Sequence, residues 1–333
     1  MVDFLGKIKI MKWIHVENWA IVGGIGTYSR DLALTFPEFS HEIIFLNTKG
    51  MQYPYIKWFN DQGIRTSFAP TGQITDDMFK DEEIIMLHNV TGKSVKEPYN
   101  WLENHRVFNV HHAATPLFSN RTELDIFVSY WLRNRFYGFE SAMKQVLVLP
   151  PCVRSKDYIN INPRKNVKTP IIGRIQSSTN QEKGKFNKCI ETLSKITGCE
   201  FLIVGNKIDK VDDARFKFAP IQIGAMSSYL NQIDIFVLDC PTTESWSRVA
   251  TEAMLAGKPV IARNYGDGLA EQMYKANAPL FSNEADFIRC MQSFVNDESL
   301  RLNIGEKLRF WALENASEKT LRSGLIDYIL KGM

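Results

Sequence analysis

The sequence predicts an α/β protein made of two doubly wound parallel sheets, each in its own domain. Three observations support this class. The chain has 333 residues, which is more than one domain usually contains. Short apolar runs alternate with longer amphipathic segments in two successive series. The apolar runs are nearly continuous rather than alternating in polarity, as is typical of parallel strands covered on both faces.

The first series begins with a strand and a helix that opens on glycine. The expected strands are residues 8–16, 41–47, 83–89, 105–112, 124–129 and 145–151, and the helix covers residues 24–36. Residues 154–169 are polar and poor in apolar side chains, so they are expected to link the two domains.

The second series repeats the pattern. Its expected strands are residues 169–175, 200–205, 218–224, 233–239 and 258–263, and its expected helices are 183–196, 227–232 and 248–257. The chain beyond residue 283 is expected to be helical. Two such series predict two Rossmann-like domains that face each other across a cleft.

The composition excludes several classes of protein. Hydrophobic residues make up 44% and charged residues 23%, and the net charge is only +3, so nothing indicates a nucleic-acid partner. The five cysteines are odd in number and lack CxxC spacing, so we expect neither a metal site nor disulfides, and a reducing cytoplasm fits. The sequence shows no apolar signal region and no run of 18 apolar residues, so neither a signal peptide nor a membrane span is expected.

The segment from Pro241 to Gly268 carries the clearest chemistry. Glu244 precedes an expected helix and Glu252 lies within it, with seven residues between them. The backbone N–H groups near Ser247 would be free at the helix start and could bind an anion. Eight helical residues span roughly 12 Å, enough to straddle a diphosphate with a sugar at one end and a ribose at the other. The spacing alone is also compatible with a solvated helix residue and a simple cap.

The stretch ESWSRVATEAMLAGKPVIARNYGDGLAE resembles the Glu-x7-Glu segment of retaining glycosyltransferases, in particular glycosyltransferase family 4. Further matches follow in order along the chain: GGIGTYSRDLAL, VFNVHHAATP, DIFVSYWLRNRFYG, QVLVLPPCV and IIGRI…EKGKF. The resemblance implies a GT-B fold. It implies an acceptor-side domain over residues 1–155, a nucleotide-sugar domain over residues 156–316, and a helix over residues 317–333 that crosses back to the first domain.

The resemblance implies roles for the residues of the second domain. Glu244 would hold the hydroxyls of the donor sugar, and Glu252 the ribose. Backbone amides near Ser247 would contact the phosphates. Arg248 stands where the family usually has an apolar residue, so it is a further phosphate contact or a sign of a different base preference. Ser245 and Ser247 replace two glycines of the family pattern, which leaves the donor open.

Cations near the diphosphate are the next implied feature. Arg174 and Lys183 would stabilise the charge of the departing diphosphate in place of a metal ion. Because four extra residues precede Lys183, Lys185 is an alternative. Gly23 and Gly24 would border the diphosphate from the first domain, where glycine permits close approach of a phosphate to the backbone.

Histidines at strand ends are candidates in the first domain. By position, His111 matches the family's histidine near the transferred sugar, and His112 stands where the family often has aspartate. His88 lies at another strand end. Each of these could also be a satisfied core residue.

The resemblance implies a retaining glycosyltransferase that moves a sugar from a nucleotide diphosphate-sugar to a hydroxyl acceptor. Glu244 and His111 are its predicted catalytic residues. No cofactor and no metal are expected beyond the nucleotide-sugar. The acceptor is a glycan, a lipid-linked molecule or a small molecule.

Alternatives are a nucleotide-sugar epimerase on the same fold and a non-catalytic nucleotide-binding protein. A dinucleotide-dependent oxidoreductase is disfavoured because the chain lacks a GxGxxG pattern.

The aromatic and basic residues of segment 125–138 suit either packing beside the cleft or contact with lipid headgroups. The expected location is the cytoplasm, with peripheral contact at the inner membrane face as the alternative.

Overall fold

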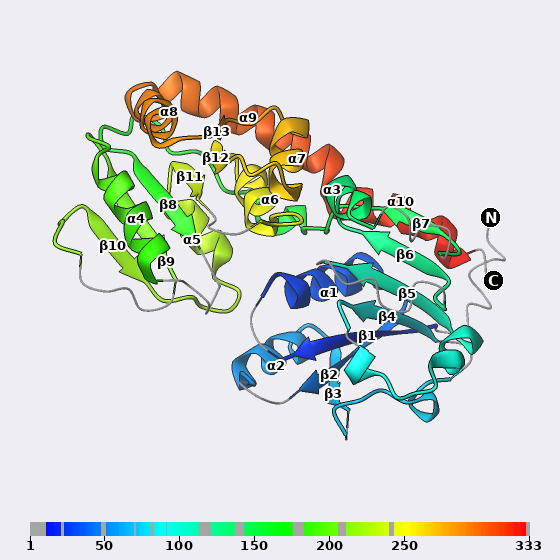
Figure 1. Cartoon of the computed structure of the whole chain (residues 1–333). Coiled ribbons are helices and arrows are strands. Elements are labelled where there is room, and N and C mark those ends of the chain that lie inside the picture. Colours follow the sequence, from blue (N-terminus) through cyan, green and yellow to red (C-terminus); the bar gives the residue numbers. More distant parts are fainter. Residues whose placement is uncertain are drawn as a thin grey trace. The chain divides into compact units, whose positions relative to one another are not determined.

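The computed structural model divides the chain into two compact units. Met1–Cys152 and Leu321–Met333 form the first unit, and Val153–Thr320 forms the second (Figure 1). The last four residues of the second unit, 317–320, fall within the predicted crossing segment. The structure describes residues 11–20, 23–47, 51–69, 71–80, 83–90, 92–112, 121–136, 143–175, 183–205, 211–239 and 243–330.

The first unit contains a seven-stranded sheet in which every strand pair is parallel, in the order β3-β2-β1-β4-β5-β6-β7. Its strands are β1 (Lys12–Trp19), β2 (Ser40–Asn47), β3 (Arg65–Phe68), β4 (Ile84–His88), β5 (Arg106–His111), β6 (Leu124–Phe127) and β7 (Val146–Val148). The order reverses direction between β1 and β4. In such sheets ligands bind at this switch point, beyond the carboxyl ends of the strands.

Different structures cover the two faces of this sheet. Helices α1 (Gly24–Thr35) and α10 (Glu318–Leu330) supply side chains to the core on one face. The core on the other face is completed by turns and by the short helices η1 (Asp76–Met78) and η3 (Tyr99–Asn104). The unit also contains α2 (Tyr53–Asn60), η2 (Gly92–Ser94) and α3 (Tyr130–Asn134).

Helix α10 joins the first unit although it lies at the far end of the sequence. Leu321, Leu325 and Ile329 are buried in the core to which α1 also contributes side chains. The Arg106 guanidinium donates hydrogen bonds of 2.7 and 3.0 Å to the last carbonyl groups of α10, at Tyr328 and Ile329. The apolar contact and the cation at the carbonyl end of the helix together hold α10 on this sheet.

The second unit repeats the same topology with six parallel strands, in the order β10-β9-β8-β11-β12-β13. The strands are β8 (Ile171–Ile175), β9 (Glu200–Val204), β10 (Phe216–Ala219), β11 (Ile235–Leu238), β12 (Val260–Arg263) and β13 (Leu280–Phe281). Its switch point lies between β8 and β11.

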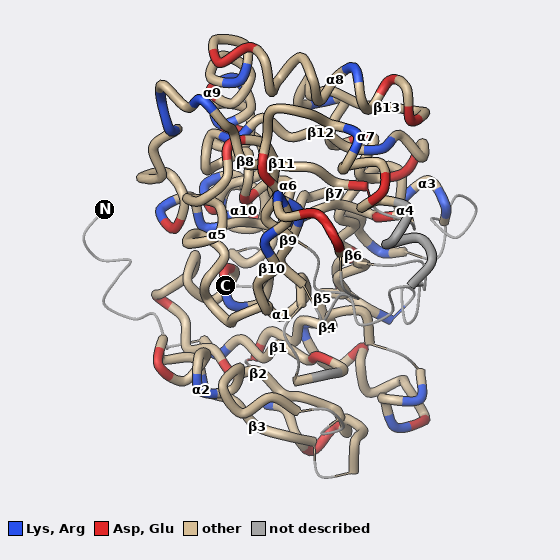
Figure 2. The backbone as a smooth tube through the Cα atoms, turned by 90° about the vertical axis from the view of Figure 1, so that its left-hand side faces the viewer, with Lys and Arg blue, Asp and Glu red and all other residues tan. Residues whose placement is uncertain are grey.

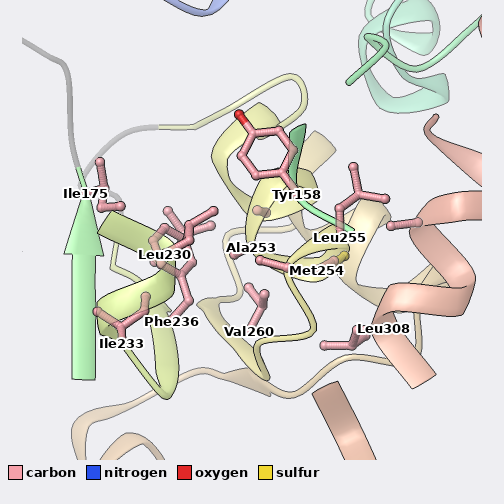
Figure 3. Packing of buried hydrophobic residues seen from close by; sticks show 14 of the residues in the cluster. Tyr158, Ile175, Leu230, Ile233, Phe236, Ala253, Met254, Leu255, Val260 and Leu308 are labelled. Carbon is pink, nitrogen blue, oxygen red and sulfur yellow. The ribbon is translucent and has the colours of Figure 1, made fainter. Parts of the chain in front are cut away.

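Helices cover both faces of the second sheet. Helices α4 (Lys183–Ser194) and α8 (Glu284–Asn296) pack on one face. Helices α5 (Met226–Gln232), α6 (Arg248–Leu255), α7 (Gly268–Lys275) and α9 (Glu298–Asn315) pack on the other, where Figure 3 shows Met254, Leu255, Val260 and Leu308 close together. This core holds α6 against the sheet, so the residues of α6 have fixed positions.

The predicted fold class is confirmed, and most predicted strands lie within a few residues of the observed ones. The strand predicted over residues 218–224 was wrong in its bounds: β10 covers Phe216–Ala219, and residues 220–225 are not strand and contain a turn at 223–224. The predicted linker, residues 154–169, also contributes side chains to the core of the second unit. Tyr158 and Ile161 are buried in the core of the second unit (Tyr158 is labelled in Figure 3), and η5 (Ser155–Asp157) precedes them.

Several elements were not predicted. Helices α2 and α7, and strands β3 and β13, had no counterpart in the sequence analysis. Strand β3 is an edge strand of sequence RTSF, and β13 has only two residues, so neither carries a clear apolar period. Within the described ranges, none of the helices is long and apolar enough to cross a membrane.

A close helix contact generates a stability prediction. A Cβ atom on Gly305 of α9 would lie 2.2 Å from the Gly257 carbonyl oxygen at the end of α6. Because backbone cannot give way easily, we expect Gly305→Ala to lower the free energy of unfolding by about 1–3 kcal/mol, despite alanine's higher helix propensity. Denaturant unfolding measures this. The exposed Asn303→Ala in the same helix is the control, and an unchanged Gly305→Ala protein would contradict the packing described.

Candidate active site

Two guanidinium groups meet one acidic residue at the switch point of the second sheet. Arg174 lies at the end of β8, is 5% exposed, and donates a 3.4 Å hydrogen bond to the Asp239 carbonyl oxygen just after β11. Arg263, at the end of β12, donates through Nε to the Asp239 carboxylate. This hydrogen bond raises the pKa of Arg263, so the group stays charged. The carboxyl edge of the sheet therefore carries two fixed cations.

The loop that contains Glu244 is built against the start of α7. The Glu244 N–H donates a 2.7 Å hydrogen bond to Asp267, whose other carboxylate oxygen caps α7 by accepting from the Ala270 N–H at 2.9 Å. The Glu244 carbonyl oxygen accepts from the Leu269 N–H. A Cβ on Gly268 would lie 1.8 Å from the Ser245 carbonyl oxygen, so only glycine permits this approach. The backbone around Glu244 is thus held at both ends, while its side chain is half-buried.

Ser247 is the N-cap of α6, but its N–H is not free as the sequence analysis expected. It donates a 3.0 Å hydrogen bond to the Gln272 side-chain oxygen, and the Gln272 amide donates back to the Ser247 carbonyl and to the Thr251 hydroxyl. Gln272 belongs to α7, so only the folded unit could reveal it. The Ser247 hydroxyl is different: Ser247 is 2% exposed, and its Oγ has no hydrogen-bond partner in the described part of the chain.

Arg248 and Glu252 form a buried pair along α6. Both side chains are 7% exposed, and their charged atoms are 3.7 Å apart, one helical turn from each other. Figure 2 shows basic and acidic positions next to each other at α6. The structure therefore brings together Ser247, Arg248 and Glu252, three of the residues predicted to bind the donor. Glu252 is not the solvated helix residue that its spacing alone allowed.

The structure describes only part of the predicted cation pair. Lys183 begins α4, but the side chains of residues 183–188 and the whole of residues 176–182 lie outside the described residues. The roles predicted for Lys183 and Lys185 therefore stay predictions.

In the first unit, Gly23 and Gly24 open α1 as predicted. Gly23 is the N-cap with extended backbone (φ −172°), and a Cβ there would meet nothing within 4 Å. The close approach occurs instead at Gly26, where a Cβ would lie 1.5 Å from the Tyr55 hydroxyl and 3.1 Å from a Glu17 carboxylate oxygen. Gly26 is thus the glycine that the packing requires.

His111 and His112 lie on opposite faces of the first sheet. The Nε2 of His111 lies 2.7 Å from an Asp125 carboxylate oxygen, and its ring stacks on Phe127 with centroids 4.4 Å apart. Thr122 and Asn109 donate hydrogen bonds to the same carboxylate. His111 is 1% exposed, so its imidazole is enclosed by protein on that face. Its predicted catalytic role stays a prediction.

His112 instead ends a chain of four histidines beneath α1. Consecutive ring nitrogens lie 3.2–3.4 Å apart from His41 to His15, from His15 to His88 and from His88 to His112. At the far end, the Nε2 of His41 donates to the Phe36 carbonyl oxygen. Because that carbonyl can only accept, each neutral ring in turn must donate through Nε2 and accept through Nδ1. The network thereby leaves His112 with its Nδ1 as an acceptor.

Burial favours the uncharged form of three of these histidines. It lowers the pKa of His15 and of His88 well below the usual value, and the neighbouring histidines lower both further. Burial also lowers the pKa of His41. The hydrogen-bonded imidazoles run toward the carboxyl edge of the sheet, where His88 ends β4 and His112 follows β5.

Glu17 adds a buried carboxyl group at the switch point of the first sheet. It lies opposite His88 in the register of β1 and β4 and is 3% exposed. Burial raises its pKa from 4.5 to about 7, partly offset by a hydrogen bond with Ser29. The sequence analysis missed Glu17, although its place at the end of the first strand was a usable signal. It missed Arg263 and Asp239 in the same way.

Comparison with known proteins finds a family match within the second unit. Residues 171–297 match the family model described as Glycosyl transferases group 1, and this segment contains Arg174, Glu244, Ser247, Arg248 and Glu252. Comparison with curated proteins finds no match.

Solved structures of glycosyltransferases match nearly the whole chain. Alr3699/HepE from Anabaena, in complex with UDP and glucose, superposes with a TM-score of 0.74 at 14% identity, covering 97% of this chain and 100% of that one. A glycosyltransferase from Rickettsia africae gives 0.72 at 15% identity (96% and 98% covered), and sucrose-phosphate synthase from Thermosynechococcus elongatus gives 0.70 at 14% (97% and 99%). The chain therefore has the two-domain GT-B fold of glycosyltransferases.

The raised pKa of Glu17 generates a pH prediction. A carboxyl group whose folded pKa exceeds its unfolded value stabilises the fold most at low pH, and this contribution is lost as the pH rises from 4.5 through 7. Glu17→Gln does not titrate, so we expect it to gain about 2–3 kcal/mol of unfolding free energy relative to the unmodified protein between pH 5 and pH 8. Denaturant unfolding at both pH values measures this.

The control for this experiment is Asp61→Asn, an exposed residue of the same unit. Its effect on stability should be small and nearly equal at the two pH values. A Glu17→Gln effect that did not change with pH would contradict the burial of a protonated carboxyl group.

Proposed function

We propose that the protein is a retaining glycosyltransferase that transfers a sugar from a nucleotide diphosphate-sugar to a hydroxyl acceptor. One observation carries the proposal: the Ser247 hydroxyl is buried without a hydrogen-bond partner among the described residues. Ser247 occupies the N-cap position of α6, beside the Glu244 loop and next to the Arg248–Glu252 pair. Buried polar groups are normally hydrogen-bonded, so this hydroxyl calls for a ligand. The match of residues 171–297 to a glycosyltransferase family supports a nucleotide-sugar as that ligand.

The proposed contacts follow from charge and hydrogen-bonding capacity. The diphosphate lies at the start of α6, where the helix dipole favours an anion and the Ser247 hydroxyl can donate to a phosphate oxygen. Arg174 and Arg263 stabilise the negative charge from the sheet edge, together with Lys183 as the resemblance implies. Glu252 accepts hydrogen bonds from the ribose hydroxyls, and Glu244 accepts them from the hydroxyls of the donor sugar.

In the proposed reaction, the bond between the anomeric carbon and the leaving phosphate oxygen breaks, and the diphosphate keeps the electron pair. The acceptor oxygen bonds to the anomeric carbon on the face that the diphosphate leaves, and its proton passes to the leaving phosphate. This route retains the anomeric configuration and needs no second carboxylate. The guanidinium groups supply the charge that a metal ion would otherwise provide. The family's Glu-x7-Glu pattern, present here as Glu244 and Glu252, supports retention.

A UDP-sugar is the first donor to test because Alr3699/HepE was solved with UDP and with UDP-glucose. The proposed acceptor is a glycan, a lipid-linked sugar or a small hydroxyl compound. Peripheral contact with the inner face of a membrane, through the aromatic and basic residues near α3, belongs to the proposal for a lipid-linked acceptor.

Nucleotide binding can be tested through Ser247. UDP, GDP and ADP, each at about 100 times its dissociation constant, should stabilise the protein by roughly 2.7 kcal/mol if bound. Ser247→Ala removes a hydroxyl that has no partner in the described structure, so the ligand-free protein should keep its stability. Loss of a hydrogen bond to a charged phosphate should weaken nucleotide binding about 10- to 150-fold.

The measurement is a thermal-shift titration of both proteins. The control is Ser228→Ala, an exposed serine of α5 that should bind the nucleotide normally. Equal affinity for the nucleotide in Ser247→Ala and in the unmodified protein would remove the main support for this donor site.

Catalysis can be tested through Glu244. Glu244→Gln keeps the backbone bonds to Asp267 and Leu269 but weakens acceptance from sugar hydroxyls, so kcat/KM should fall roughly 10- to 150-fold with little change in stability. Turnover is followed with a nucleotide-sugar and a hydroxyl acceptor, with Glu200→Gln on β9 as the control. Activity should persist in EDTA, and NMR of the product should show a retained anomeric configuration.

Two outcomes of the turnover assay would contradict the proposal. Consumption of the donor without an acceptor, with the sugar still attached to the nucleotide, would indicate an epimerase. Unfolding of Glu244→Gln would indicate that the carboxylate serves the fold.

A further inference from the structure

The first unit contains a cavity on the edge of its sheet opposite the switch point. Its volume is about 1020 Å³, and its lining residues lie within 75–79 and 96–105 and at Arg121. His105 directly precedes β5, and Arg121 lies shortly before β6, so the cavity opens beside the amino ends of these strands. The carboxyl ends, with His88 and His112, lie at the other edge. The cavity is therefore separate from the switch point.

A fixed aromatic layer forms part of the cavity lining. Trp101 and Phe79 stack with centroids 5.6 Å apart and an interplanar angle of 15°. The ring of His105 contacts both edge-on, at 5.7 and 5.9 Å. The Trp101 indole N–H donates to the Lys96 carbonyl oxygen. Because these rings belong to the core on this face, the lining does not need to be ordered by a ligand.

One polar atom of this layer requires a partner. The side chain of His105 is 3% exposed, and its Nε2 lies 2.7 Å from the Asp76 carboxylate, to which it donates. Its Nδ1 is buried and has no hydrogen-bond partner among the residues that the structure describes. A hydroxyl group can pair with Nδ1, because it donates to the neutral ring that carries its proton on Nε2 and accepts from the doubly protonated ring.

The charges of the cavity exclude an anionic ligand. Four carboxylates line it, against two cationic side chains, Lys96 and Arg121. Three of the carboxylates are also engaged: Asp76 accepts from His105, Glu97 from the Tyr99 hydroxyl and Glu103 from Arg121. In the described structure no group of three or more His, Cys, Asp or Glu side chains is placed to hold a metal ion. The cavity thus favours a neutral ligand over a phosphate or a metal.

A carbohydrate has the properties that these groups would recognise. Its hydroxyls donate to carboxylates and to an imidazole nitrogen, and they accept from side-chain amides such as those of Asn100 and Asn104. Its C–H surfaces can pack on aromatic rings. The volume lies at the upper end of the range for small-molecule sites, which suits more than one sugar ring.

We propose that this cavity binds an oligosaccharide and forms a second carbohydrate site, away from the switch point of the same sheet. Carbohydrate binding does not depend on the proposed function. The further assignment, that the bound sugars are a distal part of a glycan acceptor, rests on it. A site of this kind would hold a growing glycan between successive transfers and so raise its effective concentration at the reaction.

The test measures binding of maltohexaose, cellohexaose and chitohexaose to the full chain by saturation-transfer NMR and calorimetry. We expect at least one hexasaccharide to bind. Asp77→Asn and Asn100→Ala change exposed residues of the cavity, and each should weaken that binding about tenfold, the loss expected for one hydrogen bond to the sugar. UDP binding should be unchanged in both variants, and the exposed Asp61→Asn should bind the hexasaccharide normally.

The outcomes separate this proposal from the proposed function. If no hexasaccharide binds, or if binding is equal in Asp77→Asn, Asn100→Ala and the unmodified protein, the second site is refuted even when the enzyme turns over a nucleotide-sugar. If a hexasaccharide binds and both variants weaken it, the site is established even when no nucleotide-sugar is consumed. The assignment to a glycan acceptor additionally requires that the bound hexasaccharide accept a sugar.

Discussion

The carboxylate of Asp267 makes the interaction on which the candidate donor site depends. Its two oxygens accept from the Ala270 N–H, at the start of α7, and from the Glu244 N–H. Because Gly268 lacks a Cβ, the loop can lie directly against this helix start. Gln272, one turn further along α7, holds Ser247 in the same way. The loop is therefore in place before any ligand binds, which reduces the ordering cost of binding.

Helix α6 buries polar side chains of the candidate donor site as well as apolar ones. Helix α6 packs Ala253 and Met254 into the core, yet the same helix buries Arg248, Glu252 and the Ser247 hydroxyl. A buried ion pair contributes little net stability, because removing two charges from water offsets most of their attraction. These residues are hard to explain by folding alone. The buried Ser247 hydroxyl is understandable if a ligand supplies its hydrogen-bond partner.

The first unit carries polar groups at both edges of one sheet. At the carboxyl edge, Glu17 and the histidine chain place titratable groups beneath α1, and burial shifts the pKa values of Glu17, His15 and His88 toward the uncharged form. At the amino edge, His105 and its carboxylate partner lie beside stacked rings. The alternation of side chains along a strand separates His111 from His112, although they are adjacent in sequence. His111 at the end of β5 thus belongs to a buried cluster with Asp125, whereas His112, the next residue, belongs to a hydrogen-bond network that runs to Phe36.

The sequence by itself determined the fold class, because continuous apolar strands separated by amphipathic helices can be buried only as parallel sheets covered on both faces. It also brought Ser247, Arg248 and Glu252 together, since neighbours on one helix need no tertiary information. Only the tertiary structure decided which residues form hydrogen bonds with the groups of the candidate sites. Asp267 and Gln272, at the start of α7 and within it, hold the Glu244 loop and Ser247. Four histidines meet from four different chain segments, and His105 after η3 meets Asp76 of η1. Such contacts join residues far apart in sequence, so the local periodicity of the sequence cannot predict them.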